Sequence, residues 1–410
     1  MSNIPSGDEL FFSKEAADYL KISTQRLNKL VQIGKIHPLK KNASGAVFHI
    51  DELNRRKDEL AIFTNVDQGG KSGMFVIDSK EKNEALNFAT LMNVMEITEN
   101  KLDPLFNEFA KTEDVSAPIS QMVDVYARYF SLSEDGLLRE YDRAKKAFSG
   151  LRETDEIIKR GSKDYPPLLI KTEQAPRFLY IRGKKSLLFE KRTVALVGSR
   201  QASEASKENT RRLAESLGKN GITVVSGLAK GIDVTAHMTA LDNGYNTISV
   251  IGTNLNQYYP PENKAIQLEI EKRGLVVSQF SPAAKTQRWF FPLRNGVMSG
   301  LSLATVIMEA GETSGALKQA DFALKQGRQV LIPKKALEME NITWPAKYVQ
   351  RGAIVVDTPS DVLRELAENN IFKMERAPEP VQQTLEDYFS EENKRNATKK
   401  NVYWLDPVSV

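Results

Sequence analysis

The sequence contains no cysteine, which excludes a disulfide scaffold, thiolate metal sites and a cysteine nucleophile. Histidine occurs only at His37, His49 and His237, so we expect no zinc site built from histidine and cysteine. No stretch reaches the ~18 apolar residues that a membrane-spanning helix requires, and residues 1–8 lack the features of a secretion signal. These absences predict a cytoplasmic protein that contacts neither a metal nor a membrane.

A strong excess of charge of either sign is also missing. Lys and Arg together number 57 against 53 Asp and Glu, a formal net charge of +4. This balance permits nucleic-acid binding without requiring it, so a polyanion site must come from a local cluster. A chain of 410 residues with 41% hydrophobic content can bury more than one core. The expected parts are an N-terminal module over 1–65, a helical connector over 74–160, an α/β core over 161–372 and a poorly ordered tail over 373–410.

The N-terminal module has the pattern of a winged helix-turn-helix. A short helix capped by Ser13 is followed by a second helix from Ser23 that Gly34 ends, and then by a basic turn and an alternating strand. Residues 11–53 resemble the excisionase and MerR class of DNA-binding modules. The side chains expected to contact duplex DNA are Gln25, Arg26, Lys29, Gln32, Lys40 and Lys41. The alternative is a small helical domain for protein contacts whose charged face is only solvated.

Residues 74–160 have amphipathic patterns that predict helices near 80–97, 119–130 and 137–148. We identify no chemical motif in this region. It is therefore expected to be a helical connector that packs on the next domain.

From Thr193 onward, short β-branched runs alternate with longer amphipathic stretches, a pattern typical of a parallel sheet flanked by helices. The predicted strands are 193–197, 222–226, 247–251, 275–278, 303–308, 329–332 and 353–356. The predicted helices are 203–219, 233–242, 262–272, 314–326 and 361–369. The fold class is therefore α/β, a Rossmann-like doubly wound parallel sheet.

Two glycine-rich turns follow the first two strands of this sheet. One is Gly198-Ser199-Arg200, and the other runs from Ser226 to Asp233. The carboxyl edge of a parallel sheet is where open α/β folds bind ligands. Glycine allows close backbone approach to a phosphate, and arginine can bind one through two hydrogen bonds. Together the two turns predict an anion-binding rim.

The order of motifs along the core resembles that of the DprA/Smf family of DNA-processing proteins. The motifs are Gly198-Ser199-Arg200, Ser226-Gly227-x-Ala229-x-Gly231-Ile232-Asp233-x-x-Ala236-His237, Tyr259-Pro260, Phe291-Pro292-x-Arg294-Asn295, Glu309-Ala310 and Ser314-Gly315. Upstream, Tyr165-Pro166 and Arg182-Gly183 continue the likeness, which covers about 165–356.

This resemblance implies a core that binds single-stranded DNA, commonly as a homodimer, and that helps to load a RecA-type recombinase. Aromatic residues next to arginine suit base stacking beside phosphate contacts. The residues that we carry over or place on this track are Gly198, Ser199, Arg200, Ser226, Gly227, Lys230, Gly231, Lys285, Phe291, Arg294, Asn295, Ser314 and Gly315.

The chain departs from the family pattern at three positions. Gly296 stands where a second arginine is usual, Gln279 replaces an acidic residue, and Lys334 replaces a glycine. Two further features stay ambiguous. Asp233 and His237 are spaced to meet on one helix, which more often orders a helix start than forms a catalytic pair. Glu309 either contacts a ligand or accepts N–H groups from the Ser314 turn.

We interpret the chain as a binding protein and not an enzyme, with no cofactor. There is no Walker A pattern and therefore no support for ATP hydrolysis. One alternative on the same fold is a phosphoribohydrolase of the LOG type, whose Pro-Gly-Gly-x-Gly-Thr motif is missing. The other is a sensor of a nucleotide-derived signal, such as a component of phage defence.

Overall fold

The computed structural model describes residues 10–20, 24, 27–28, 31, 36–42, 45–54, 75–339 and 342–368. The chain divides into two compact units, Met1–Ser72 and Gly73–Val410, which are treated separately below. Among the described helices, none is both long and apolar enough to cross a membrane.

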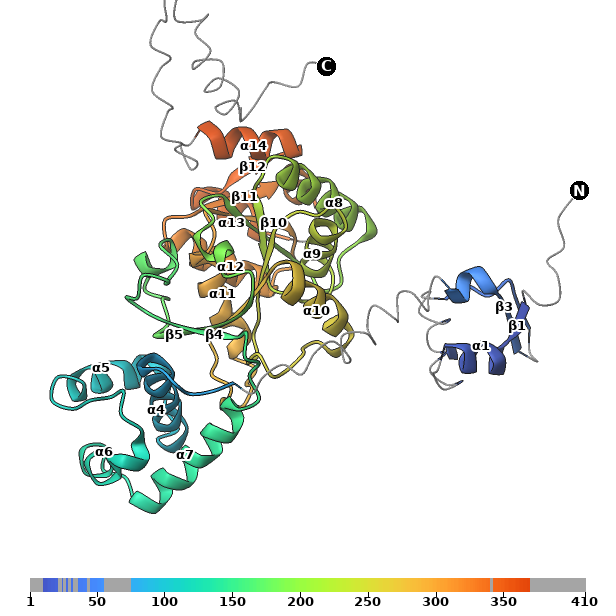
Figure 1. Cartoon of the computed structure of the whole chain (residues 1–410). Helices are drawn as coiled ribbons and strands as arrows, with labels where there is room; N and C mark the ends of the chain where they lie inside the picture. The colour runs from blue at the N-terminus through green and yellow to red at the C-terminus, as the bar shows by residue number, and fades with distance from the viewer. Residues whose placement is uncertain are drawn as a thin grey trace, which may run out of the picture. The chain divides into compact units, whose positions relative to one another are not determined.

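In the first unit, helix α1 packs on a three-stranded antiparallel sheet of order β1-β3-β2 (Figure 1). Its elements are β1 (Leu10–Phe12), α1 (Ser13–Tyr19), β2 (Lys40–Asn42) and β3 (Gly45–His49). Ala16, Ala17 and Leu20 are buried, as their shared helix face predicts. The predicted cap is wrong, because the hydroxyl of Ser13 accepts a hydrogen bond from the N–H of Ala46 at 3.0 Å and so ties the helix to β3.

The second unit contains a nine-stranded sheet of order β12-β11-β10-β6-β7-β8-β9-β5-β4. Strands β6 to β12 run parallel to one another, whereas β5 pairs antiparallel with both β9 and β4. The strands are β4 (Glu156–Lys159), β5 (Phe178–Gly183), β6 (Thr193–Gly198), β7 (Thr223–Ser226), β8 (Thr247–Val250), β9 (Leu275–Ser278), β10 (Ala304–Glu309), β11 (Gln329–Pro333) and β12 (Ile354–Val356).

Helices cover both faces of this sheet, with α8 and α9 on one side and α11 and α12 on the other (Figure 1). The helices after β6 are α8 (Glu204–Lys219), α9 (Ile232–Asp242), α10 (Lys264–Arg273), α11 (Phe290–Gly300), α12 (Gly315–Lys325), α13 (Trp344–Gln350) and α14 (Pro359–Glu368). Along β6, Val194 and Leu196 pack into the core under α8, while Ala195 and Val197 pack into the core under α11. A strand buried on both faces reads as a continuous apolar run, which is why its position was predictable.

The predicted doubly wound α/β fold is confirmed, and each predicted parallel strand exists within about a residue of its predicted position. Two kinds of element were missed. The antiparallel strands β4 and β5 lie upstream of the predicted sheet, and α11 contains Pro292, Gly296 and Gly300. Proline fits the first turn of a helix, but glycine weakens a helix interior, so packing rather than propensity maintains α11.

The helical region packs against the antiparallel end of the sheet. It contains α4 (Lys80–Val94), α5 (Glu99–Phe109), α6 (Val123–Phe130) and α7 (Glu134–Phe148). Alternate residues of β5 point to opposite sides, so Phe178 and Tyr180 join the core of these helices. Helix α5 was not predicted, because Pro104 lies inside it, but its buried Leu102 and Phe106 maintain it.

A buried arginine joins the helical region to the sheet. Arg177, next to β5, pairs with Glu84 of α4 at 2.9 Å and with Asp103 of α5 at 2.7 Å. Its guanidinium also lies 4.8 Å from the ring centre of Phe106. Glu84 also pairs with Lys159 at 2.5 Å and Asp103 with Arg160, so Arg177 is the most buried cation of an ion-pair network between the helices and the sheet.

Candidate nucleic-acid interface

The reversal of strand order between β6 and β10 creates a cleft at the carboxyl edge of the sheet. The chain leaves β6 toward β7 on one side and leaves β10 toward β11 on the other, so their loops diverge. The cleft has a volume of about 710 Å³ and is lined by the first glycine-rich turn, the start of α11 and the start of α12. This is the position at which open α/β sheets bind ligands.

The first turn presents Arg200 to solvent at this cleft. A Cβ atom on Gly198 would lie 2.5 Å from Ile232 Cγ1, so only glycine permits this packing. The N–H of Ser199 donates to the carbonyl of Glu309 at 2.7 Å, which ties the turn to β10. Arg200 is exposed and forms no ion pair with another described residue. Its guanidinium is therefore available to a ligand.

The second turn is used mostly for internal packing. Ser226 is buried and its hydroxyl donates to the carbonyl of Leu196 at 2.6 Å, so it does not face the cleft. Lys230 forms an ion pair with Glu262. Gly231 has a φ of +76°, and a Cβ there would lie 2.2 Å from the carbonyl oxygen of Ser199. The turn therefore supports the first turn, and of its residues Ala229 and Asp233 line the cleft, whereas Ser226, Gly227, Lys230 and Gly231 do not.

Arg294 lies on the floor of the cleft, where it is almost completely buried. Its guanidinium donates to the carbonyl of Gly227 at 2.6 Å and to that of Val250. A Cβ on Gly227 would lie 2.2 Å from Arg294 Nη1, so this glycine makes room for the arginine. Burial lowers the pKa of Arg294 to about 10. Arg294 thus links the ends of β7 and β8, and fewer of its donors remain for a ligand than we predicted.

Asp233 and His237 do not form a pair, although they lie one helical turn apart. The Asp233 carboxylate accepts from the N–H of Ala229 at 3.3 Å, and burial raises its pKa. The His237 ring nitrogen Nδ1 lies 2.8 Å from the hydroxyl of Thr247, and burial lowers the pKa of His237 to about 3. The geometry fits the structural reading of these residues.

Glu309 stabilises the start of α8. Its carboxylate accepts from the hydroxyl of Ser203 at 2.6 Å and from the N–H of Ser203 at 3.1 Å. These hydrogen bonds outweigh desolvation and lower the pKa of Glu309. The alternative prediction, that Glu309 accepts N–H groups from the Ser314 turn, is wrong. Because a protein carboxylate already occupies the start of α8, that helix end is closed to a phosphate.

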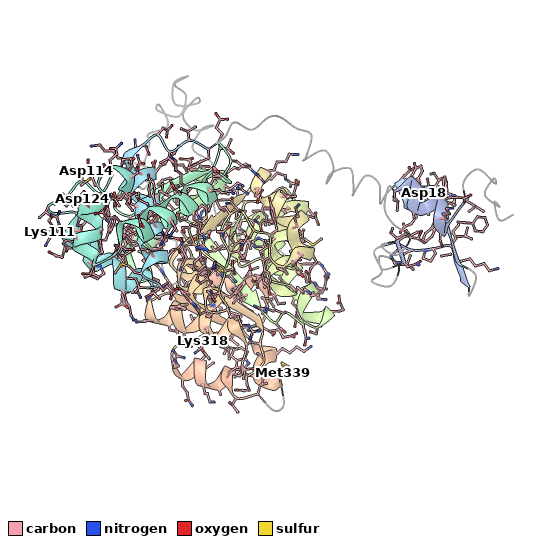
Figure 2. All side chains as sticks on the ribbon, turned by 90° about the horizontal axis from the view of Figure 1, so that it is seen from below. Asp18, Lys111, Asp114, Asp124, Lys318 and Met339 are labelled. Carbon is pink, nitrogen blue, oxygen red and sulfur yellow. The ribbon has the colours of Figure 1, made fainter. Side chains whose placement is uncertain are left out.

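The start of α12 remains open to the cleft. Ser314 caps the helix by accepting from the N–H of Ala316 at 3.3 Å, and Gly315 leaves open space beside it. Asn295 of α11 donates to the carbonyl of Gly315 at 3.2 Å, which positions this turn. Lys318, on the next turn, also lines the cleft, and its side chain is 68% exposed and lies 3.9 Å from Asp321. Figure 2 labels Lys318 among the side chains of the core. Helix N-termini and nearby cations favour an anion here.

An aromatic pair lies at the start of α11. Phe291 lines the cleft, and its ring lies 5.0 Å from that of Tyr259, which is 47% exposed. Tyr259 belongs to the Tyr259-Pro260 motif, for which the sequence predicted no ligand contact, and Lys318 was not predicted either. Both residues are therefore additions to the candidate site. Lys285, by contrast, is exposed but does not line the cleft.

Gly296, where the family pattern has a second arginine, lies on the side of α11 that faces away from the cleft. A Cβ at this position would lie 2.7 Å from Gln174 Cγ and 3.3 Å from the Phe322 ring. It therefore points away from the cleft, and its lack of charge leaves the cleft unchanged.

The predicted duplex contacts of the first unit are only partly visible. Lys40 lies in β2 and is exposed, and Lys41 follows it in the same strand. Gln25, Arg26, Lys29 and Gln32 lie outside the described residues.

The fold and the cleft define a Rossmann-like protein with an open cleft at the switch point of its sheet. The profile of the family described as DNA recombination-mediator protein A matches residues 156–367, just over half of the chain. DNA processing protein DprA of Streptococcus pneumoniae is 33% identical over 290 residues, which cover 70% of this chain and 96% of that protein. The chain therefore belongs to the DNA recombination-mediator protein A family.

A solved structure of the pneumococcal relative agrees with this assignment. The X-ray structure of DprA from Streptococcus pneumoniae has a TM-score of 0.54 at 29% identity and covers 70% of this chain and 95% of its own. A structure of DNA processing protein A from Helicobacter pylori, described for that protein's single-stranded DNA binding mode, has a TM-score of 0.47 at 26% identity and covers 52% and 96%.

Proposed function

We propose that this protein is a DNA recombination mediator that binds single-stranded DNA without strong sequence preference, with its phosphates in the cleft between β6 and β10. The observation that carries the proposal is Arg200, which is exposed, has no ion pair within the described part of the chain, and lines the same cleft as the open start of α12. The family of the chain and the name of its pneumococcal relative support DNA as the ligand.

The cleft favours a single strand over a duplex. Phe291 and Tyr259 offer ring surface at the rim, and base stacking on such rings requires bases that are not already stacked in a helix. Backbone amides, Arg200 and Lys318 recognise phosphate and not base edges. Affinity should therefore vary little with sequence and strongly with salt.

Binding rather than catalysis is the activity that we assign to the cleft. Asp233, which lines the cleft, and Glu309, at the end of β10, already accept backbone hydrogen bonds within the fold. The hydroxyl that donates to Glu309 is that of Ser203, which caps α8 and does not line the cleft.

Further partners follow from the resemblance and remain proposals. The core would form a homodimer, assist a RecA-type recombinase and act in the cytoplasm. The first unit would bind duplex DNA through the predicted second helix, with Lys40 and Lys41 on phosphates. The exposed position of Lys40 on a β-hairpin supports this assignment.

A salt series with the full chain tests the main proposal, using labelled single-stranded DNA, duplex DNA and a nucleoside monophosphate. Arg200→Ala should weaken single-strand binding by about 1.5–3 kcal/mol and reduce the salt slope by about 1. Arg212→Ala is the matched control, because Arg212 is an exposed arginine of α8 that pairs with Glu208 and lies outside the cleft.

Equal affinity of the Arg200→Ala and Arg212→Ala variants would contradict the assignment of the cleft. Saturable binding of the nucleotide without binding of single-stranded DNA would favour the alternative function as a nucleotide sensor. The volume of the cleft is within the range of small-ligand sites.

A further inference from the structure

The cleft between β6 and β10 carries an excess of positive charge. Arg200 and Lys318 line it with exposed side chains, and Arg200 has no ion pair within the described part of the chain. Among the described residues that line the cleft, the acidic one is Asp233, which is buried, and its burial raises its pKa. Such a surface attracts an anionic group even when no DNA is bound.

The chain itself contains an anionic stretch with aromatic rings. Residues 369–410 lie outside the described part of the chain, and their sequence has no lysine or arginine over 377–393. Residues 386–392 (the acidic segment) are Glu-Asp-Tyr-Phe-Ser-Glu-Glu. Carboxylates on both sides of aromatic rings repeat the chemistry of a single strand, in which phosphates flank the bases. The acidic segment therefore matches the kind of ligand that we propose for the cleft.

The length of chain before the acidic segment is sufficient to reach the cleft. Helix α14 ends at Glu368, and residues 369–385 can extend to roughly 55 Å. The cleft opens beside β10, two strands from β12, a lateral distance of about 10 Å. The ten residues of α14 add about 15 Å if the chain has to return along the helix. The connection is thus about twice as long as the path.

We propose that the acidic segment occupies the cleft when no DNA is bound and that single-stranded DNA displaces it. Its carboxylates would pair with Arg200 and Lys318, and the rings of Tyr388 and Phe389 would contact Phe291 at the rim. The inference rests on the proposed function, because the segment and the strand compete for the same groups. Both are recognised by charge and ring surface, so the competition lowers affinity for every sequence equally.

The test neutralises the acidic segment in the full chain. Deleting the whole tail would also remove the basic residues within 394–400, so the variant instead combines Glu386→Gln, Asp387→Asn, Glu391→Gln and Glu392→Gln. At low salt this fourfold variant should bind labelled oligo(dT) about tenfold more tightly than the wild type does, because the tethered competitor is lost. The difference should shrink as salt rises, since salt screens the pairing of the segment with the cleft.

A control variant makes the same change in net charge elsewhere. It neutralises four exposed carboxylates of the helical region, none of which lines the cleft, by Glu96→Gln, Glu108→Gln, Asp124→Asn and Glu134→Gln. Its affinity for oligo(dT) should stay within about twofold of wild type, because distant exposed charges are screened. An equal gain in affinity in both variants would overturn the inference, since net charge alone would then explain it.

A labelled peptide of residues 384–393 separates this inference from the proposed function. It should bind the fourfold variant with a dissociation constant of about 0.1 mM, the affinity at which an effective concentration of about 1 mM produces a tenfold effect. Oligo(dT) should displace the peptide, and adding Arg200→Ala to the variant should weaken its binding. A peptide with Gln and Asn in place of the four carboxylates is the control and should not bind.

Equal affinity of the wild type and the fourfold variant for oligo(dT), with no binding of the acidic peptide, would overturn the inference and leave single-strand binding by the cleft intact. Binding of the peptide that depends on Arg200, without binding of oligo(dT), would support the segment as an occupant of the cleft and contradict the proposed function. A gain in affinity that appears only at high protein concentration would place the segment in the cleft of a second copy, and so overturn its binding to its own cleft.

Discussion

The cleft and the contact between the helical region and the sheet both depend on arginine, but in opposite ways. At the cleft, Arg200 is exposed and unpaired among the described residues. At the helical contact, Arg177 is buried between Glu84 and Asp103. An exposed charge can exchange water for a ligand, whereas a buried one is committed to its protein partners. Substitutions should therefore change binding at the first region and stability at the second.

The largest expected effect is at the helical contact. Arg177→Met removes the buried partner that Glu84 and Asp103 share and leaves them paired only with the more exposed Lys159 and Arg160, so we expect it to lower the free energy of unfolding by about 3–5 kcal/mol. Denaturant unfolding measures this. Arg128→Ala is the control, because its ion pair with Asp124 is 79% exposed at the arginine and should matter by less than about 1 kcal/mol. Similar losses of unfolding free energy in the two variants would contradict the difference between the buried and the exposed arginine.

A carboxyl group beside this contact should make stability depend on pH. Burial raises the pKa of Glu99 from 4.5 to about 7. The folded protein then holds a proton that the unfolded chain releases, so this group's contribution to stability falls as pH rises from 4.5 to 7. Glu99→Gln removes the effect, and its stability relative to wild type should rise by about 3 kcal/mol across that window. Parallel pH curves for the two proteins would refute the assignment.

Arg294 lies at the cleft but is buried like Arg177. It therefore tests whether burial or position decides if an arginine serves stability or binding. Arg294→Met leaves the carbonyls of Gly227 and Val250 without their donor, at a cost of about 2 kcal/mol in stability. Single-strand affinity should fall as well, because the second turn loses its support. If affinity fell while stability stayed unchanged, Arg294 would be a direct ligand contact like Arg200.

The smallest effect is expected at Glu309, which ends β10 and whose carboxylate serves the fold. Glu309→Ala removes the acceptor for Ser203 at the start of α8 and should cost about 1 kcal/mol in stability. Affinity for single-stranded DNA should remain within experimental error of wild type. A marked change in affinity, measured beside thermal unfolding, would show that Glu309 belongs to the ligand site.

Much of the core was predictable because its signals are local. Continuous apolar runs such as that of β6 located the parallel strands, and the glycine-rich turn at Gly198 followed directly from them. Helix α11 was missed because its glycines argue against a helix. Its contribution comes from Phe290 and Val297, which pack against partners distant in the sequence.

The amino-acid sequence by itself determined the doubly wound sheet and the edge of that sheet where the cleft lies, since hydrophobic period and turn residues act over a few neighbouring positions. Only the tertiary structure decided which arginine is free. Arg200 and Arg294 both belong to the family's motifs, and Arg177 belongs to none that we identified. Arg294 is occupied by the carbonyls of Gly227 and Val250, and Arg177 by the carboxylates of Glu84 and Asp103. These partners lie far from the arginines in the sequence, so they meet only when the sheet and the helices have packed.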